Sequence, residues 1–228
     1  KIMGPASPSM MDTIGVLVEG FEKKPYILMP YNKAYYPKLF RDGGFEKEMG
    51  MFAYVVRDDT VSMDRIKRAG KIVMKRNPGL NIRPVNLKKM DDEALIIREI
   101  FNKAWAANWG FIPLSEAEMA AVAKDLKMIL DPDLACVAEI DGEPIAFSVA
   151  LPDYNQVFDT MNGNLFPFGI VKLLMGRKKI NRCRTALMGV LPEYQGKGID
   201  ALLHQRAIER GPKKGIRESE LSWILETN

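Results

Sequence analysis

The chain has 228 residues, of which 47% are hydrophobic and 27% charged, a composition that excludes a disordered protein. No apolar run approaches the roughly 18–20 residues that span a bilayer, and residues 1–11 lack the apolar core of a secretory signal. The net charge of +4 suits an anionic small ligand but is too weak to indicate nucleic acid. We therefore expect a cytoplasmic protein in which Cys136 and Cys183 are free thiols.

The first 57 residues contain short apolar runs and one short helix. Residues 14–18 and 26–29 are bounded by Gly and Pro, which predicts two strands. A helix is predicted around residues 35–40, with Pro37 in its first turn and Gly43-Gly44 at its end. Residues 51–56 are predicted to be extended.

Residues 58–80 differ from their surroundings because basic side chains surround a few apolar positions. The pattern predicts a connecting helix that ends at the consecutive breakers Asn77, Pro78 and Gly79. We take this segment as a linker between two domains. Its basic face is more typical of a solvated surface than of a polyanion site.

From residue 82 onward the predicted order is strand, helix, helix, strand, strand, irregular helical insertion, strand, glycine turn, helix and strand. The helix over residues 91–104 follows the 3.6-residue period, and Ser115 with Glu118 forms a capping box for the next helix. Asp141-Gly142 joins the apolar runs 134–140 and 144–151 as a hairpin turn. The insertion covers residues 157–175, and the last helix and strand cover 201–209 and 220–225.

The glycine turn lies between the strand over residues 185–190 and the helix that follows, in the stretch VLPEYQGKGIDALL. Such a turn leaves the first helical N–H groups unpaired, and with the helix dipole they form an anion site. A Walker A loop is excluded because Gly198, and not Ser or Thr, follows Lys197. A dinucleotide fingerprint fits poorly because the turn comes late, after a hairpin. A plain strand-to-helix corner is the alternative.

The turn and its flanks resemble motif A of the GNAT superfamily, the acyl-CoA-dependent N-acyltransferases, whose pattern is Gln/Arg-x-x-Gly-x-Gly/Ala. The resemblance implies a mixed α/β fold with a mostly antiparallel sheet flanked by helices, an acyl-CoA co-substrate such as acetyl-CoA, an amine acceptor and no metal. It implies that the CoA pyrophosphate binds the amides of Gln195, Gly196, Lys197, Gly198, Ile199, Asp200 and Ala201. It implies pantetheine contacts at Met188, Gly189 and Val190, and Asn228 at the end of the last strand joins the candidate CoA-binding residues. Asp200 departs from the pattern, so its carboxylate has to point away from the phosphate.

The resemblance also gives an interpretation of residues 1–57. Residues 26–32 and 221–228 each end an apolar run in Asn, and residues 35–47 are similar to the closing half of a GNAT domain. The expected organisation is a tandem piece of a longer protein: 1–57 from a first GNAT-like domain, 58–80 as linker, and 81–228 as a second domain without its closing helix and strands. In the alternative, residues 26–57 complete the second sheet themselves.

The candidate acceptor contacts are Trp105, Asn108 and Trp109, in the stretch FNKAWAANWGF. Two Trp four residues apart share one face of a helix, and in GNAT proteins the corresponding helices wall the acceptor side of the cleft. Packing is the alternative role for both rings, since aromatic side chains at helical spacing usually pack.

Catalytic residues are not identified by the sequence. Glu193, Asp153 and Glu139 lie near strand ends and could take a proton from an attacking amine, but none has a distinctive spacing. The expected reaction is acyl transfer from acyl-CoA to a small-molecule or peptide amine. Two alternatives stay open: a non-catalytic acyl-CoA-binding module, and a peptidyl transferase that uses aminoacyl-tRNA, which the two basic stretches (58–78 and 172–184) would suit.

Overall fold

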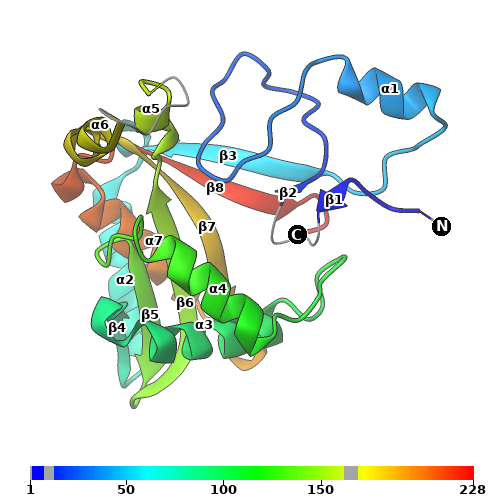
Figure 1. Ribbon diagram of the computed structural model, residues 1–228. Helices are drawn as coiled ribbons and strands as arrows, with labels where there is room; N and C mark the ends of the chain where they lie inside the picture. Colours follow the sequence, from blue (N-terminus) through cyan, green and yellow to red (C-terminus); the bar gives the residue numbers. More distant parts are fainter. Residues whose placement is uncertain (1, 8–12, 162–168) are drawn as a thin grey trace.

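The computed structural model describes residues 2–7, 13–161 and 169–228, and one six-stranded sheet forms its centre (Figure 1). In spatial order the strands are β3 (Met51–Arg57), β8 (Glu218–Leu225), β7 (Arg182–Val190), β6 (Glu143–Pro152), β5 (Ala135–Ile140) and β4 (Leu80–Pro84). Every neighbouring pair is antiparallel except β7 and β8, which run parallel. A two-stranded ribbon, β1 (Ala6–Ser7) with β2 (Thr13–Ile14), stands apart from the sheet. The predicted mixed, mostly antiparallel α/β fold is confirmed.

Helices flank both faces of this sheet. They are α2 (Met63–Arg76), α3 (Met90–Ala104), α4 (Glu116–Leu126), α5 (Asn155–Phe158), α6 (Gly169–Gly176) and α7 (Ile199–Arg210), whereas α1 (Tyr36–Asp42) lies in the N-terminal segment away from the sheet (Figure 1). Helix α3 covers one face of the sheet. It packs closely at Gly189, where an added Cβ would lie 3.2 Å from Ala104 of α3 and 2.8 Å from the ring of Phe147. Helix α7 covers the opposite face, with α2 packed against it. The core between these layers is almost entirely aliphatic and aromatic.

Several local predictions are confirmed because their chemistry is local. Asp141 and Gly142 both have positive φ angles, 52° and 89°, as the two-residue hairpin turn between β5 and β6 requires. Ser115 caps α4 in a complete capping box with Glu118. Pro37 lies in the first turn of α1, and Gly44 follows the helix with a φ of 80°.

Two predicted strands are wrong. Of residues 14–18 only Ile14 is paired, in the short ribbon, and residues 26–29 form a turn in which the amide of Met29 donates to the carbonyl of Tyr26. Tyr26 and Ile27 are nevertheless buried, so their apolar character reflects packing against the sheet and not pairing within it. In the insertion, residues 162–168 lie outside the described part; α5 and α6 occupy its described ends.

Strand β3 lies at the edge of the main sheet, antiparallel to β8, with Met51 opposite Leu225 and Arg57 opposite Glu218. Figure 1 shows the two strands side by side beneath the blue N-terminal segment. This is the pairing of the alternative hypothesis, in which part of residues 26–57 completes the sheet. The topology does not show a division into two GNAT-like units, and that division stays a prediction.

The helix predicted in the linker is α2, and it packs closely on α7. A Cβ at Gly70 would lie 1.9 Å from the side-chain oxygen of Gln205 and 3.1 Å from Leu202, so a small residue is needed where the two helices cross. Helix α2 is therefore part of the packed structure around the sheet.

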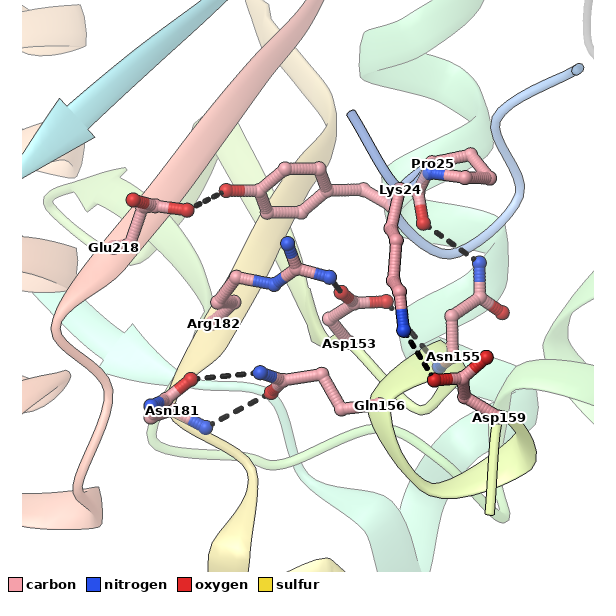
Figure 2. A network of polar contacts seen from close by, with 10 residues as sticks. Lys24, Pro25, Asp153, Asn155, Gln156, Asp159, Asn181, Arg182 and Glu218 are labelled. Atoms are coloured by element: carbon pink, nitrogen blue, oxygen red, sulfur yellow. Dashed lines mark hydrogen bonds and ion pairs between the residues drawn. The ribbon is translucent and has the colours of Figure 1, made fainter. Parts of the chain in front are cut away.

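A polar network ties the N-terminal segment to the end of the sheet (Figure 2). Asp153, which is fully buried, pairs with Arg182 at 2.6 Å, and the Arg182 guanidinium lies 4.4 Å from the centre of the Tyr26 ring. The Tyr26 hydroxyl donates to Glu218, and the Asn155 side chain donates to the carbonyl of Pro25 at 3.0 Å. Burial, with the hydrogen bond to Glu218, raises the pKa of Tyr26.

Deletion of residues 1–57 is therefore expected to destabilise the remainder strongly. It removes Ile27 from the core, a loss that costs about 2–5 kcal/mol by itself for an aliphatic side chain cut to Ala. It also exposes the edge of β8, which invites aggregation. We expect a fall in Tm of about 10 °C or more, measured by circular dichroism. An unchanged Tm would favour two independent units instead.

Candidate active site

Strands β7 and β8 pair over only half of their length. Four pairs are formed, from Arg182 with Glu218 to Thr185 with Leu221, and beyond the last pair the strands diverge. The gap between residues 186–190 of β7 and 222–225 of β8 is here called the V. Because β7 pairs with β6 on its other side, the edge that faces the V is its free edge.

A bulge on each strand coincides with the start of the V. In β7, Val149 and Ala150 of β6 oppose Leu187 and Thr185, which leaves Ala186 as an extra residue. In β8 the pairing with β3 shifts by one residue between Leu221 and Ile224. An extra residue bends and twists its strand, so two bulges beside the last common pair split the sheet there.

The free edge of β7 presents backbone groups to the V. The indole N–H of Trp105 donates to the carbonyl of Met188 at 2.9 Å, and the Gln195 side chain donates to the carbonyl of Val190 at 3.0 Å. Both carbonyls therefore face away from β6. In an extended strand the N–H of a residue points to the same side as its C=O, so the amides of Met188 and Val190 also face the V. An amide-containing chain such as pantetheine can pair with this edge.

The glycine turn lies at the open end of the V and leads into α7. Gly196 and Gly198 have φ angles of 70° and 81°, which glycine adopts without strain. Gly198 is the N-cap of α7, and it supplies no side-chain cap. Among the described residues, no acceptor is found for the backbone N–H groups of residues 196–201. These amides, at the positive end of a twelve-residue helix, form an anion site.

The two glycines of the turn differ in the space around them: Gly196 faces open space, and Gly198 packs against α2. A Cβ at Gly196 would meet nothing within 4 Å, whereas a Cβ at Gly198 would lie 2.7 Å from Val73 of α2. Lys197 places its ammonium 4.8 Å from the centre of the Tyr194 ring, which keeps a positive charge beside the turn. The structure thus brings the predicted residues 195–201 together at one site with Met188 and Val190.

Asp200 lies in the first turn of α7 with its side chain exposed. Its negative charge stands near the amides that would receive a phosphate, so Asp200→Ala is expected to strengthen CoA binding about three- to tenfold. Isothermal titration with CoA measures this, with Asp125→Ala on the exposed face of α4 as the control for loss of a surface carboxylate. Weaker binding by Asp200→Ala would show instead that the carboxylate supports the site.

A buried polar cluster lies at the closed end of the V, on the face that α3 covers. Arg184 is 4% exposed, and its Nε donates to the Ser222 hydroxyl at 2.8 Å. That hydroxyl donates to Glu220 at 2.8 Å, and the guanidinium Nε lies 3.9 Å from the same carboxylate oxygen. The other end of the guanidinium donates to the carbonyls of Ile27 and Leu28, at 3.2 Å each.

Burial shifts the pKa values of two side chains in this cluster, Glu220 and Arg184. Burial raises the pKa of Glu220, against the opposing effects of the Ser222 hydrogen bond and Arg184. Burial also lowers the pKa of Arg184 to about 10, which leaves it a cation at neutral pH. A carboxylate with a raised pKa at the end of a cleft is suited to accept a proton. Glu220 was not among the candidates that the sequence offered, because a glutamate at the start of the stretch ELSWIL carries no distinctive signal.

The three carboxylates that the sequence offered as proton acceptors have other surroundings. Asp153 is paired with Arg182, and burial raises its pKa. Glu139 accepts from Arg83 at 2.6 Å, far along the sheet on β5. Glu193 is exposed in the turn before the glycines. None of the three is at the closed end of the V.

The predicted acceptor residues are placed differently from the expectation. Helix α3 ends at Ala104 with Trp105 as its C-cap, so Trp105 and Trp109 do not share a helix face, and that expectation is wrong. Trp105 packs on Phe101 with ring centres 4.9 Å apart and reaches the V through Met188. Asn108 is exposed and Trp109 half-buried in the turn that follows. Their contact with an acceptor stays a prediction.

The remaining predicted residues also have defined places. Asn228 is exposed beyond β8, and its amide donates to the carbonyl of Leu225 at 3.0 Å. Cys136 and Cys183 are free, as expected, and they are buried; burial raises the pKa of each thiol to about 11.

Across the described ranges, no group of three or more His, Cys, Asp or Glu side chains is arranged to hold a metal ion. No helix in that part of the chain is long and apolar enough to cross a membrane.

The split strands, the glycine turn and the unpaired amides all lie in a part of the chain that matches a known family. Residues 95–228, which run from α3 to the end of β8, match the family described as "Acetyltransferase (GNAT) family". The chain belongs to this family. The GNAT match begins inside α3, so β3, α2 and β4 lie outside it. Strands β3 and β4 nevertheless form the two edges of the same six-stranded sheet.

Two relatives of this GNAT chain align over its whole length. One is "Protein YghO" of Escherichia coli, 39% identical over 236 residues, and the other is "Bacterial ceramide synthase" of Caulobacter vibrioides, 34% identical over 233 residues. The alignments cover 100% and 99% of this chain and 60% of each relative, so the chain spans about three fifths of their length.

Solved structures confirm the GNAT fold. A GCN5-related N-acetyltransferase from Sphaerobacter thermophilus superposes with a TM-score of 0.54 over 85% of this chain and 48% of its own, at 14% identity. A GCN5-related glucosamine N-acetyltransferase region of a fungal multi-domain enzyme gives a TM-score of 0.52 over 82% of this chain and 20% of its own, also at 14% identity. At these identities the likeness concerns the fold alone.

Proposed function

We propose that the protein is an N-acyltransferase that moves an acyl group from acyl-CoA to an amine. The observation that carries the proposal is the combination of a sheet split at Thr185 and Leu221 with a row of unpaired amides over residues 196–201. The name of the Caulobacter relative suggests an amine that belongs to a lipid. A small-molecule or peptide amine is the broader class. The cytoplasmic location stays a prediction.

The residues fit CoA along the V. The amides of residues 196–201 and the dipole of α7 would bind the pyrophosphate, with Lys197 as a nearby cation. The free edge of β7 at Met188 and Val190 would pair with the amides of pantetheine. A strand from residue 190 to residue 186 spans about 13 Å, which brings the thioester to the closed end of the V.

The chemistry at the closed end then follows from the neighbouring groups. An amine nitrogen attacks the thioester carbonyl, the new C–N bond forms, the C–S bond breaks, and CoA leaves as a thiolate that takes up a proton. Glu220 accepts the proton that the nitrogen loses. Arg184 and Ser222 fix the Glu220 carboxylate, and backbone N–H groups on the β7 edge stabilise negative charge on the carbonyl oxygen.

Binding and transfer are tested separately. CoA at about a hundred times its dissociation constant should raise the stability of the protein by roughly 2.7 kcal/mol, seen as an increase in Tm. Release of free thiol from acetyl-CoA and octanoyl-CoA is then followed against a panel of amines that includes long-chain amino alcohols. Binding without transfer would support the non-catalytic module. No binding of CoA, together with salt-dependent binding of RNA, would support the peptidyl transferase instead.

A further inference from the structure

An apolar cavity of about 180 Å³ lies under the C-terminal half of α7, on the face opposite to the Arg184 cluster. Its wall is formed mainly by aliphatic side chains from β3, α7 and β8 and from the connections beside them. They are Val56, Val61, Ala207, Ile208, Ile216 and Leu221. Such a lining favours an alkyl chain over a polar ligand.

The cavity adjoins the closed end of the V. Thr185 and Leu221, the last residues that β7 and β8 pair, both line it. Helix α7 connects the two sites as well: its N-terminus holds the glycine turn, and His204, Ala207 and Ile208 further along line the cavity. A thioester at the closed end of the V therefore has an apolar cavity directly beside the carbon chain of its acyl group.

The opposite face is polar at the end of the V. There the buried guanidinium of Arg184 and the carboxylate of Glu220 occupy the end of the V, and the backbone of Ile27 and Leu28 covers them. An alkyl chain placed there would have to pack against charged, hydrogen-bonded groups, which are costly to bury without their partners. The two faces thus differ in chemistry: the polar face suits the amine and its proton, and the apolar face suits the acyl chain.

The charged residues that line the cavity form ion pairs with one another. Arg217 pairs with Asp58 at 2.8 Å, and Arg57 pairs with Glu218 at 2.9 Å. His204 also lines the cavity, and burial lowers its pKa, so its imidazole is neutral at pH 7. The interior therefore carries no fixed charge from this histidine.

We propose that this cavity binds the acyl chain of an acyl-CoA several carbons long, so that the donor is a fatty acyl-CoA in preference to acetyl-CoA. The inference rests on the proposed function, because it places the thioester at the closed end of the V. It specifies which class of acyl-CoA is the donor. It also assigns the selection of acyl-chain length to Ala207 and Ile208 of α7, which line the cavity.

The test is the binding of CoA, acetyl-CoA, butyryl-CoA, hexanoyl-CoA and octanoyl-CoA, measured by titration calorimetry. Each methylene that enters the cavity should tighten binding by about fourfold, so octanoyl-CoA should bind at least tenfold more tightly than acetyl-CoA. In Ala207→Phe the ring fills the cavity, and the gain with chain length should disappear while the affinity for acetyl-CoA stays within threefold. Ala121→Phe, on the exposed face of α4, makes the same change away from the cavity and should keep the gain.

The outcomes separate the two claims. Equal affinity for the whole series in the unaltered protein overturns the cavity as an acyl site and leaves the CoA site standing. A gain with chain length that Ala207→Phe retains also overturns it, because the chain then binds elsewhere. Failure of CoA itself to bind overturns the proposed function, and the inference with it.

Discussion

Gly196→Asp is expected to weaken CoA binding about 300-fold without unfolding the protein. Gly196 has a φ of 70° and open space around its Cα, and among residues other than glycine, Asp and Asn tolerate this conformation best. The new carboxylate would stand in the anion site. At about 5 Å and an intermediate dielectric constant, its repulsion of a phosphate is about 2 kcal/mol, or roughly thirtyfold in affinity.

Gly196→Asn is the matched control because it has the same shape and no charge. We expect about tenfold weaker binding for Asn, from the volume of the side chain, and a further thirtyfold or more for Asp. Calorimetric titration of both variants with CoA gives the difference, and Tm confirms folding. Equal affinities for Asp and Asn would mean that no phosphate binds at the turn.

Glu220→Gln is expected to lower kcat for acyl transfer about 10²- to 10⁴-fold and to leave the affinity for CoA within threefold. Because burial raises the pKa of Glu220, the active carboxylate is lost at a higher pH than for an ordinary glutamate. The rate of the unaltered protein should therefore fall as the pH drops through this raised value. Glu220→Gln should lose that acidic limb of the pH profile.

A structural role for Glu220 makes a different prediction. Removing one partner of a buried ion pair costs about 3–5 kcal/mol, so Glu220→Gln also destabilises the fold. Asp153→Asn removes the buried carboxylate from Arg182 on the same sheet and is the control. It should lower Tm similarly but keep kcat within threefold. A Glu220→Gln variant that lowers Tm but keeps kcat and the acidic limb would exclude Glu220 as the proton acceptor.

The parts of the fold that local chemistry determines could be predicted from the sequence. The turn at Asp141-Gly142 needs positive φ angles, the cap at Ser115 needs one nearby glutamate, and α7 follows directly from its glycine turn. The glycine turn with its unpaired amides was predictable for the same reason, since it consists of consecutive residues.

The rest depends on contacts between distant parts of the chain. The edge position of β3 arises from pairing with β8, more than 160 residues later, and apolar residues 26–29 are buried in a turn that looks like a strand in sequence. The pKa of Glu220 is raised because distant segments of the chain bury its carboxylate, and Ser222 and Arg184 oppose that shift. No spacing in the sequence indicates that combination.

A crystal structure of the protein with CoA would show whether the glycine turn and the V bind the cofactor. It should show the pyrophosphate on the amides of residues 196–201, pantetheine paired with β7 at Met188 and Val190, and the thiol at the closed end of the V beside Thr185 and Leu221. CoA bound away from the glycine turn, or with its thiol outside the V, would exclude the V as the acyl-transfer site.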